Sequence, residues 1–224
     1  MSLADWWRRR RPETTDAGAG SGGERWLVLD VESSGLDPQR DALLSIAAVA
    51  LRQDGARLHI NLGDSFEVTL RRTVDVADKA NVLVHGIGVG AQRAGTAPEE
   101  ALQAFAMFAA DAPLIGYHSA FDRTLIERAQ RSARLPVMRN PWLDLAELAP
   151  VLCPAAAHEP PRRALDDWLA HFAIPCVARH QAAADALATG ELLLRLWPAA
   201  CAQGATRGFR TLSGLAAARR WLPA

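Results

Sequence analysis

The first third of the chain contains three hydrophobic runs that are typical of β-strands. Residues 26–31 (Trp-Leu-Val-Leu-Asp-Val) are almost all apolar, and residues 42–51 form a second apolar run that ends before Gln-Asp-Gly. A continuous apolar run of this length is typical of a strand buried on both faces. Residues 58–70 instead alternate between apolar and polar side chains. This alternation predicts a third strand, antiparallel to its neighbour and near an edge of the sheet.

The rest of the chain predicts helices that alternate with short strands. Four stretches predict helices: 98–110, 121–133, 165–172 and 181–197. Short apolar runs at 113–117 and 142–145 predict two more strands, and the Pro/Ala-rich segment 153–161 predicts a loop. Three strands followed by alternating helices and strands indicate an α/β fold, with a mixed five-stranded central sheet flanked by helices.

The length of 224 residues is enough for one domain with a sizeable core. We expect residues 1–24 to form a flexible N-terminal tail, residues 25–198 to form the domain and residues 199–224 to form a short C-terminal extension. In the tail, two tryptophans precede Arg8–Arg11 without the apolar stretch that a signal peptide needs. This basic run suits a solvated tail or a contact with anionic lipid or nucleic acid.

Composition narrows the class of protein. The 25 basic and 25 acidic residues give a formal net charge of zero, which excludes a strongly basic nucleic-acid coat but allows a local basic patch. The three cysteines (Cys153, Cys176 and Cys201) are odd in number and lack C-x-x-C spacing. This argues against a disulfide framework or a zinc site and favours the reducing cytoplasm. No apolar run approaches the roughly 20 residues of a membrane span, so we expect no membrane partner.

Two carboxylates stand at the end of the first predicted strand. Asp30 and Glu32 are two residues apart, so the alternation of a strand puts both side chains on one face. Neighbouring carboxylates at the end of a buried strand are costly without a cation. A strand that simply runs out into a polar loop would explain them equally well. The following Ser33-Ser34-Gly35-Leu36 predicts a turn, in which Gly35 permits a close approach of the backbone to a ligand.

Two further segments place polar residues at predicted helix starts. Asp122 lies in the first turn of a helix, where the helix dipole alone would favour an acid. His180 and Asp185 are five residues apart and would diverge by about 140° on one helix. They face one centre only if His180 lies on the preceding loop, although a lone histidine before a helix is often purely structural. The alanines at 182–184 predict that this helix lies close to the sheet.

In chain order these residues read Asp-x-Glu, Asp, His-x4-Asp, and the sequence resembles the DEDDh 3′–5′ exonucleases. This DnaQ-like group includes the proofreading epsilon subunit of bacterial DNA polymerase III. The resemblance covers residues 25 to 198 and is carried by the following segments: Asp30-Val-Glu32-Ser-Ser-Gly-Leu-Asp-Pro, Val84-His85-Gly86-Ile87, Ala120-Phe121-Asp122, and Leu165-Asp-Asp-Trp-Leu through Arg179-His180 to Thr189. It implies a ribonuclease H-like fold.

The chain departs from the family pattern at two places. Ser33-Ser34 stands where the family often has Thr-Thr or Ser-Thr, and Tyr117-His118-Ser119 stands where it usually has His-Asn-Ala. These positions shape the substrate pocket and the sugar contact. The departures therefore bear on substrate preference rather than on the metal site.

The resemblance implies phosphodiester hydrolysis with two divalent ions, Mg²⁺ or Mn²⁺, which both prefer carboxylate oxygen. Asp30, Glu32 and Asp185 would hold one ion, Asp30 would bridge to the second, and Asp122 would hold that ion directly or through water. His180 would accept a proton from the attacking water, a role that histidine suits at neutral pH. The products would be nucleoside 5′-monophosphates released from the 3′ end of a single strand.

The resemblance also suggests contacts to the terminal nucleotide. The turn formed by Ser33, Ser34, Gly35 and Leu36 would offer backbone amides and an apolar wedge. Phe121 matches a position that would stack on a base, although a place in the core explains it equally well. His85 matches a family position near the substrate, and a place in the core explains it equally well. His118 stands at a substrate-contacting position where the family usually has asparagine.

The sequence is compatible with three candidate functions. A 3′–5′ exonuclease on DNA, in proofreading or repair, is favoured over an RNA 3′-end trimming enzyme of the same fold. A non-catalytic module that binds a polymerase or clamp is the third, and the presence of all five predicted catalytic residues argues against it. The C-terminal segment favours a stand-alone nuclease, with association with a DNA polymerase left open. The glycines of 86–90 resemble a dinucleotide fingerprint, but Gly95 and Pro98 interrupt the helix that must follow.

Overall fold

The structure is a computed structural model that describes residues 23–72, 86–158 and 164–218. Within these ranges five strands form one sheet, in the order β3-β2-β1-β4-β5. The strands are β1 (Glu24–Ser33), β2 (Leu43–Asp54), β3 (Arg57–Thr69), β4 (Leu114–Gly116) and β5 (Trp142–Asp144). β1, β2 and β3 are successively antiparallel, whereas β4 and β5 run parallel to β1. The predicted mixed sheet is confirmed, with β3 at the edge as expected.

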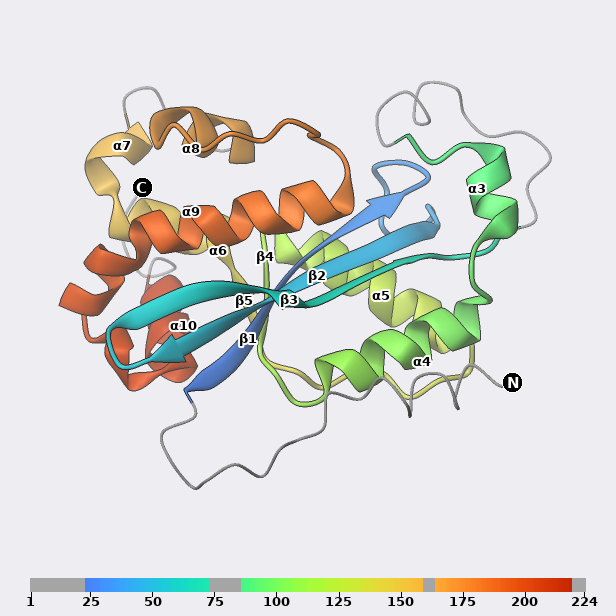
Figure 1. The fold of residues 1–224 in the computed structure, drawn as a ribbon, viewed down its shortest axis with the longest axis horizontal. Helices are drawn as coiled ribbons and strands as arrows, with labels where there is room; N and C mark the ends of the chain where they lie inside the picture. The colour runs from blue at the N-terminus through green and yellow to red at the C-terminus, as the bar shows by residue number, and fades with distance from the viewer. Residues whose placement is uncertain (1–22, 73–85, 159–163, 219–224) are drawn as a thin grey trace.

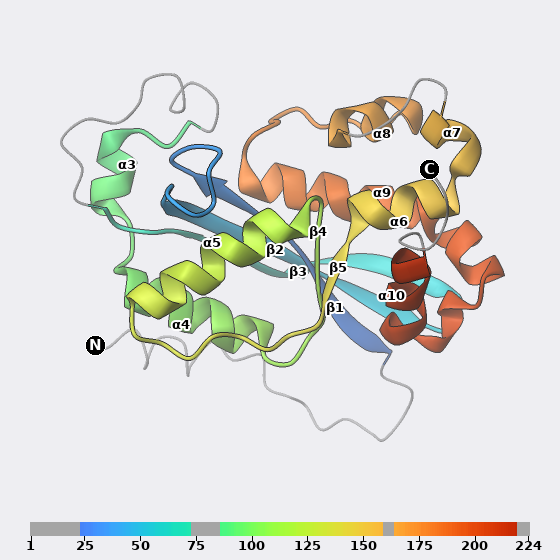
Figure 2. The same cartoon turned by 180° about the vertical axis from the view of Figure 1, so that it is seen from behind.

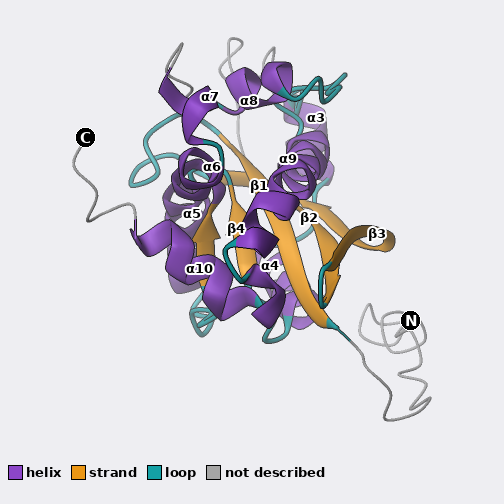
Figure 3. Cartoon of the chain, turned by 90° about the vertical axis from the view of Figure 1, so that its left-hand side faces the viewer, coloured by secondary structure: helices purple, strands orange, loops and turns teal. Residues whose placement is uncertain are grey.

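Helices cover both faces of this sheet (Figure 1). Their bounds are α3 (Val89–Ala94), α4 (Pro98–Ala109), α5 (Ser119–Ser132), α6 (Leu145–Leu152), α7 (Pro154–His158), α8 (Leu165–His171), α9 (Ala182–Ala202), the 3-10 helix η1 (Ala205–Arg207) and α10 (Phe209–Ala218). α9 crosses the face of the sheet that is turned to the viewer in Figure 1, and α5 crosses the opposite face, which is seen in Figure 2. Figure 3, which separates helices from strands by colour, shows the strands lying between helices.

Alternation along β1 feeds two separate hydrophobic cores. Trp26 and Val28 point into the core that is shared with α6, α8, α9 and α10. Leu27, Leu29 and Val31 point into the core that is shared with α4 and α5. Both faces of β1 are therefore buried, which is the reason for its nearly continuous apolar sequence.

Three segments differ from the predicted elements. Residues 154–158 form the helix α7 rather than a loop, because a proline at the first helical position and the alanines after it favour a helix. α6 begins at Leu145, which had been predicted as strand, and Asp144 caps it by accepting from Ala146 N at 2.9 Å. α9 continues past Pro198 to Ala202.

The helix α10 also lies outside the predicted elements. Phe209 and Leu212 are buried in the same core as Trp26, and Glu24 Oε2 accepts a hydrogen bond from Phe209 N at 2.8 Å. The first residues of β1 and the last described helix are thus held together. No helix among the described residues has the length and apolarity that a bilayer crossing requires.

Small residues bring α9 close to the sheet. Ala182, Ala186 and Thr189 are buried along this helix, whereas Ala183 is exposed, so only part of the predicted alanine face contacts the core. A Cβ on Gly190 would lie 3.5 Å from Ile60 Cδ1, which is an ordinary contact distance. The helix therefore lies beside β1 and carries the side chains of its first turn to the end of that strand.

Candidate active site

The first two acids lie at the C-terminal end of β1. Asp30 is paired with Ala47 of β2 and Glu32 with Ser45. Their side chains alternate with Val31, which enters the core below α4 and α5, so both carboxylates point to the side of α9. The prediction that they share one face follows directly from this register.

Asp122 reaches the same place from α5. It lies in the first turn of the helix and only 3% of it is exposed. Its Oδ2 is buried without a hydrogen-bond partner among the described residues. A Cβ on Gly116 would lie 2.9 Å from that oxygen, so a glycine at the end of β4 leaves the space that the carboxylate uses. A buried carboxylate oxygen without a partner is costly unless a ligand completes it.

His180 and Asp185 meet across the start of α9. His180 lies on the loop before the helix with φ 63°, and Asp185 lies in the first turn with 6% exposure. The backbone N–H of His180 donates to Asp185 Oδ2 at 3.0 Å, and the thiol of Cys176 lies 3.7 Å from Oδ1. His180 thus lies on the loop before the helix, which is the arrangement that the five-residue spacing requires if both residues are to face one centre. His180 is exposed to solvent.

Burial and mutual repulsion dominate the electrostatics of these acids. Burial raises the pKa of Asp30 well above its usual range, and the charges of Asp122, Asp185 and Glu32 raise it further. Burial, followed by the charge of Asp185, raises the pKa of Glu32 to about 8. Such interactions require that the carboxylates lie close together, so the structure brings the four acids into one cluster.

Asp122 has the same kind of environment. Burial raises the pKa of Asp122 well above its usual range. Hydrogen bonds from the backbone amides of Asp122 and Val31 have the opposite, smaller effect. The charge of Asp144, at the end of β5, raises the pKa again. Sequence reasoning missed Asp144, although its position at the end of a predicted strand matches that of Asp30. Its Oδ1 accepts from the amides of His118 and Ala146, both at 2.9 Å, so it fixes the start of α5 as well as α6.

The donor set fits hard divalent cations. It consists of carboxylate oxygens, includes the unpartnered Oδ2 of Asp122, and lies where negative charge is unfavourable without a cation. Among the described residues, no three Asp, Glu, His or Cys side chains already stand in a metal-coordinating arrangement. One of the four acids, Asp185, faces a protein cation, since Nη1 of Arg179 forms an ion pair with its Oδ1.

The loop between β1 and β2 is held by its own hydrogen bonds. Asp41 accepts from the Ser34 hydroxyl at 3.1 Å and from the amide of Asp37 at 2.8 Å. A Cβ on Gly35 would lie 2.5 Å from Asp41 Oδ2, so glycine is needed here for contact within the loop, independently of any ligand. The Ser33 hydroxyl donates to the carbonyl of Gly35. Leu36 is left 93% exposed at the tip of the loop.

The other predicted substrate residues differ in their exposure to solvent. His118 is exposed at the start of α5, with φ 60°, and its ring lies edge-on to Tyr117. Phe121 is half-buried and packs against the core below α4 and α5. His85 lies outside the described residues.

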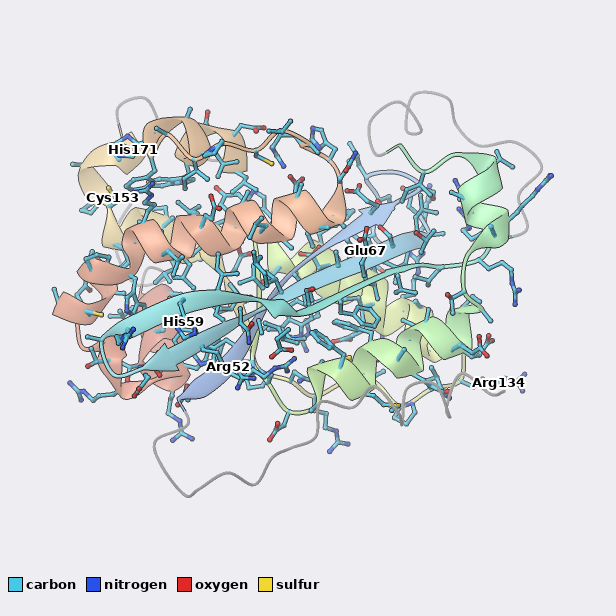
Figure 4. All side chains as sticks on the ribbon, in the orientation of Figure 1. Arg52, His59, Glu67, Arg134, Cys153 and His171 are labelled. Atoms are coloured by element: carbon cyan, nitrogen blue, oxygen red, sulfur yellow. The ribbon has the colours of Figure 1, made fainter. Side chains whose placement is uncertain are left out.

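Two further histidines, His59 and His171, are labelled in Figure 4. His59 is paired with Arg52, which is in turn paired with Arg25 near the start of β1, at the opposite end of that strand from Glu32. His171 is the last residue of α8 and lies on the left of the view in Figure 4. Of the histidines whose side chains are described, His118 and His180 are therefore the ones at the candidate site.

Most arginines near the site are already engaged with protein groups. Arg123 and Arg131 both pair with Glu127 on α5, at 2.6 and 2.7 Å. Arg128 donates to the backbone carbonyls of Pro38 and Asp41 and so anchors the β1–β2 loop. Arg162 and Arg163 lie outside the described residues. Among the described residues, Arg123, Arg128 and Arg131 therefore already have protein partners.

Comparison with known proteins agrees with this geometry. The sequence pattern of the exonuclease family RNase T matches residues 27–193. The chain is 33% identical over 185 residues to a DNA polymerase III subunit epsilon-like protein of Rhodobacter capsulatus, covering 81% of this chain and 25% of the relative. It is 28% identical over 172 residues to the PolC-type DNA polymerase III of Latilactobacillus sakei, covering 76% of this chain and 11% of the relative. The chain thus spans a quarter or less of these relatives.

Solved structures show the same fold. Exonuclease I of Escherichia coli, in complex with a dT13 oligonucleotide, superposes with a TM-score of 0.65 at 19% identity. The match covers 85% of this chain and 46% of that protein. The fold is thus ribonuclease H-like, as expected.

The chain is therefore an exonuclease domain built on a mixed α/β sheet. More particularly, it belongs to the RNase T exonuclease family, and the resemblance to the DEDDh, DnaQ-like 3′–5′ exonucleases is confirmed.

Proposed function

We propose that this domain removes nucleoside 5′-monophosphates from the 3′ end of single-stranded DNA by metal-dependent hydrolysis. The observation that carries the proposal is the convergence of Asp30, Glu32, Asp122 and Asp185 from one strand and two helices. Burial and the charges of neighbouring acids raise the pKa of Asp30, Glu32 and Asp122, and one buried oxygen of Asp122 lacks a hydrogen-bond partner among the described residues. A structure that tolerates this much unfavourable charge is suited to bind cations.

Asp30, Glu32, Asp122 and Asp185 would hold two Mg²⁺ or Mn²⁺ ions. When bound, such ions neutralise charge on the scissile phosphate and lower the pKa of water. The protein residues then orient the reactants, and the exposed imidazole of His180 accepts a proton from the attacking water. The hydrogen bond that the backbone amide of His180 donates to Asp185 Oδ2 holds this base next to the acids.

The β1–β2 loop supports a role in binding the terminal nucleotide. Leu36 is an exposed apolar residue at the tip of a loop that Asp41 and Arg128 hold in shape. A large apolar side chain exposed next to a polar cluster is well suited to contact a base or a sugar. Single-stranded DNA is favoured because a neutral total charge suits a grip on one strand end rather than on long duplexes.

The physiological setting follows as part of the same proposal. Proofreading or repair, with association with a DNA polymerase, is supported by the similarity to an epsilon-like protein and to PolC. Both roles act on DNA inside the cell, so we propose that the enzyme works in the cytoplasm.

The test uses 5′-labelled single-stranded DNA and RNA of equal sequence, each incubated with Mn²⁺, Mg²⁺ or EDTA. We expect a ladder that shortens from the 3′ end, faster on DNA, and no cleavage in EDTA. Asp30→Ala should abolish the ladder. Faster shortening of the RNA would overturn the DNA preference, and full activity in EDTA or in Asp30→Ala would overturn the metal site.

A further inference from the structure

Arg179 bridges two carboxylates that differ in exposure. Its Nε and Nη2 donate to Oδ1 and Oδ2 of Asp166 at 2.6 and 3.3 Å, which makes a two-pronged contact. Its Nη1 forms an ion pair with Oδ1 of Asp185. The side chain of Asp166 is 62% exposed, whereas that of Asp185 is 8% exposed. One guanidinium therefore links a surface acid on α8 to a buried acid of the candidate site.

The charge of Arg179 acts on the other acids as well. Burial raises the pKa of Asp30 and of Glu32, and the charge of Arg179 lowers both. Because such an effect falls off with distance, the guanidinium lies close to the carboxylates of β1 as well as to α9. It thus partly offsets the repulsion within the cluster when no metal is bound.

The same guanidinium competes with a metal for one ligand. Oδ2 of Asp185 already accepts the amide of His180, and Oδ1 faces Arg179. We propose that Arg179 is a built-in counter-cation, which covers Asp185 in the metal-free enzyme and retreats wholly onto Asp166 when a divalent ion binds. This inference rests on the metal-binding role proposed above for Asp185.

Asp166 is the acid that would hold Arg179 when a metal replaces the guanidinium at Asp185. It is exposed, so it pairs with Arg179 at little desolvation cost, and it holds the guanidinium by two oxygens. Removing Arg179 frees Asp185 for a metal. Removing the charge of Asp166 leaves Arg179 with Asp185 as its acidic partner, so the metal has a stronger competitor.

The experiment measures Mn²⁺ binding by calorimetry on the full chain, without substrate. We expect Arg179→Gln to bind Mn²⁺ about tenfold more tightly than wild type, which corresponds to about 1.4 kcal/mol. Asp166→Asn should bind Mn²⁺ more weakly. The double variant should resemble Arg179→Gln, because Asp166 affects the site through that arginine. Thermal unfolding in EDTA provides a second readout, in which Arg179→Gln unfolds at a lower temperature and gains more from added Mn²⁺.

Arg179→Gln and Asp166→Asn are expected to change Mn²⁺ affinity in opposite directions, and this difference distinguishes competition with the metal from simple support of the loop. If the ion pair only held the loop in place, both single variants would weaken binding, and that result overturns the inference. Unchanged Mn²⁺ affinity in Arg179→Gln overturns it too. Arg131→Gln removes an exposed arginine that pairs on α5, and it should leave the affinity unchanged.

A further variant separates this inference from the proposed function. If wild type binds no Mn²⁺, or Asp30→Asn binds it as tightly as wild type, the metal site itself is wrong and both proposals fall. If Asp30→Asn weakens binding and Arg179→Gln does not strengthen it, only the counter-cation is wrong.

Discussion

The two sides of the site are held in different ways. On one side, Asp30 and Asp122 are fixed at the end of a buried strand and in the first turn of a helix that packs on the second core. On the other side, Arg179 and His180 lie on the loop that also contains the fully exposed Val177. Arg179 contacts α8 and α9 through side-chain ion pairs, and His180 contacts α9 through its backbone amide. The buried side concentrates negative charge, and the loop side supplies a cation and a base.

Because the two sides are held differently, their residues contribute differently to stability and to activity. The buried acids cost stability in the metal-free protein, because burial and mutual repulsion both disfavour their charge. The loop residues contribute little to the core, so they are free to differ in position between the metal-free and metal-bound states. Substitutions on the two sides should therefore affect activity, metal binding and stability in different combinations.

The largest effect is expected on the buried side, from Asp30→Asn. Exonuclease activity should fall by about a thousandfold, since metal-borne charge stabilisation is worth several kcal/mol and each 1.4 kcal/mol is a factor of ten. The same change removes a buried charge from the cluster, so the metal-free protein should become more stable. Single-turnover cleavage with Mn²⁺ and urea unfolding in EDTA measure the two effects.

Glu127→Gln is the matched control for that variant. It removes an acid that pairs with two exposed arginines on α5, and we expect activity close to wild type. Loss of both activity and metal-free stability in Asp30→Asn would contradict the description of the buried side as a strained charge cluster.

On the loop side, His180→Asn should reduce the rate of cleavage by about a hundredfold, as expected for loss of a general base. Asparagine tolerates the positive φ of this position, so the backbone amide should still donate to Asp185. Mn²⁺ affinity and thermal stability should stay near wild type. A variant that loses metal binding together with activity would show that His180 acts as structural support for Asp185.

The pH dependence of stability sharpens the same comparison. The pKa of Glu32 is raised to about 8 in the folded protein, from an ordinary value of 4.5. Between these values the folded state holds a proton that the unfolded chain has released, so the metal-free protein loses stability as pH rises from about 4.5 to about 8. Urea unfolding in EDTA at several pH values should show this decline, and Glu32→Gln should make it shallower. A decline of equal slope in both proteins would assign it to other groups.

Sequence reasoning located the buried side better than the loop side. The apolar run of β1 fixes where the strand ends, and alternation then orients Asp30 and Glu32 without further information. Asp122 and Asp185 follow from helix starts that are marked by short strands and small residues. These are local patterns, in which position along the chain determines position in space.

Contacts between distant segments were not predictable in this way. Arg179 was one of several arginines near the site in sequence, and only the fold brings it between Asp166 and Asp185. The need for Gly35 comes from Asp41 on the other limb of the same loop. Asp144 acts on Asp122 through the adjacency of β4 and β5. The end of a predicted strand marks Asp144 in the sequence, but the strand order that brings it near Asp122 is not encoded in either segment.

The smallest predicted effect concerns the exposed apolar residues that flank the two sides. Leu36 extends from the β1–β2 loop and Val177 from the loop before α9, and both are almost fully exposed. If the terminal nucleotide lies against the β1 side, Leu36→Ala should raise KM about fivefold, from the loss of about 1 kcal/mol of apolar contact. Val177→Ala, the matched variant, should leave KM unchanged.

Neither variant should change the unfolding temperature, because neither side chain is buried. Phe121→Ala serves as the contrast, since it packs against a core and should lower that temperature whether or not it also stacks on a base. A KM that rises in Val177→Ala and not in Leu36→Ala would move the nucleotide to the loop side. The strained acids would then face the reacting phosphate, and the residues beside Arg179 and His180 would hold the base and sugar.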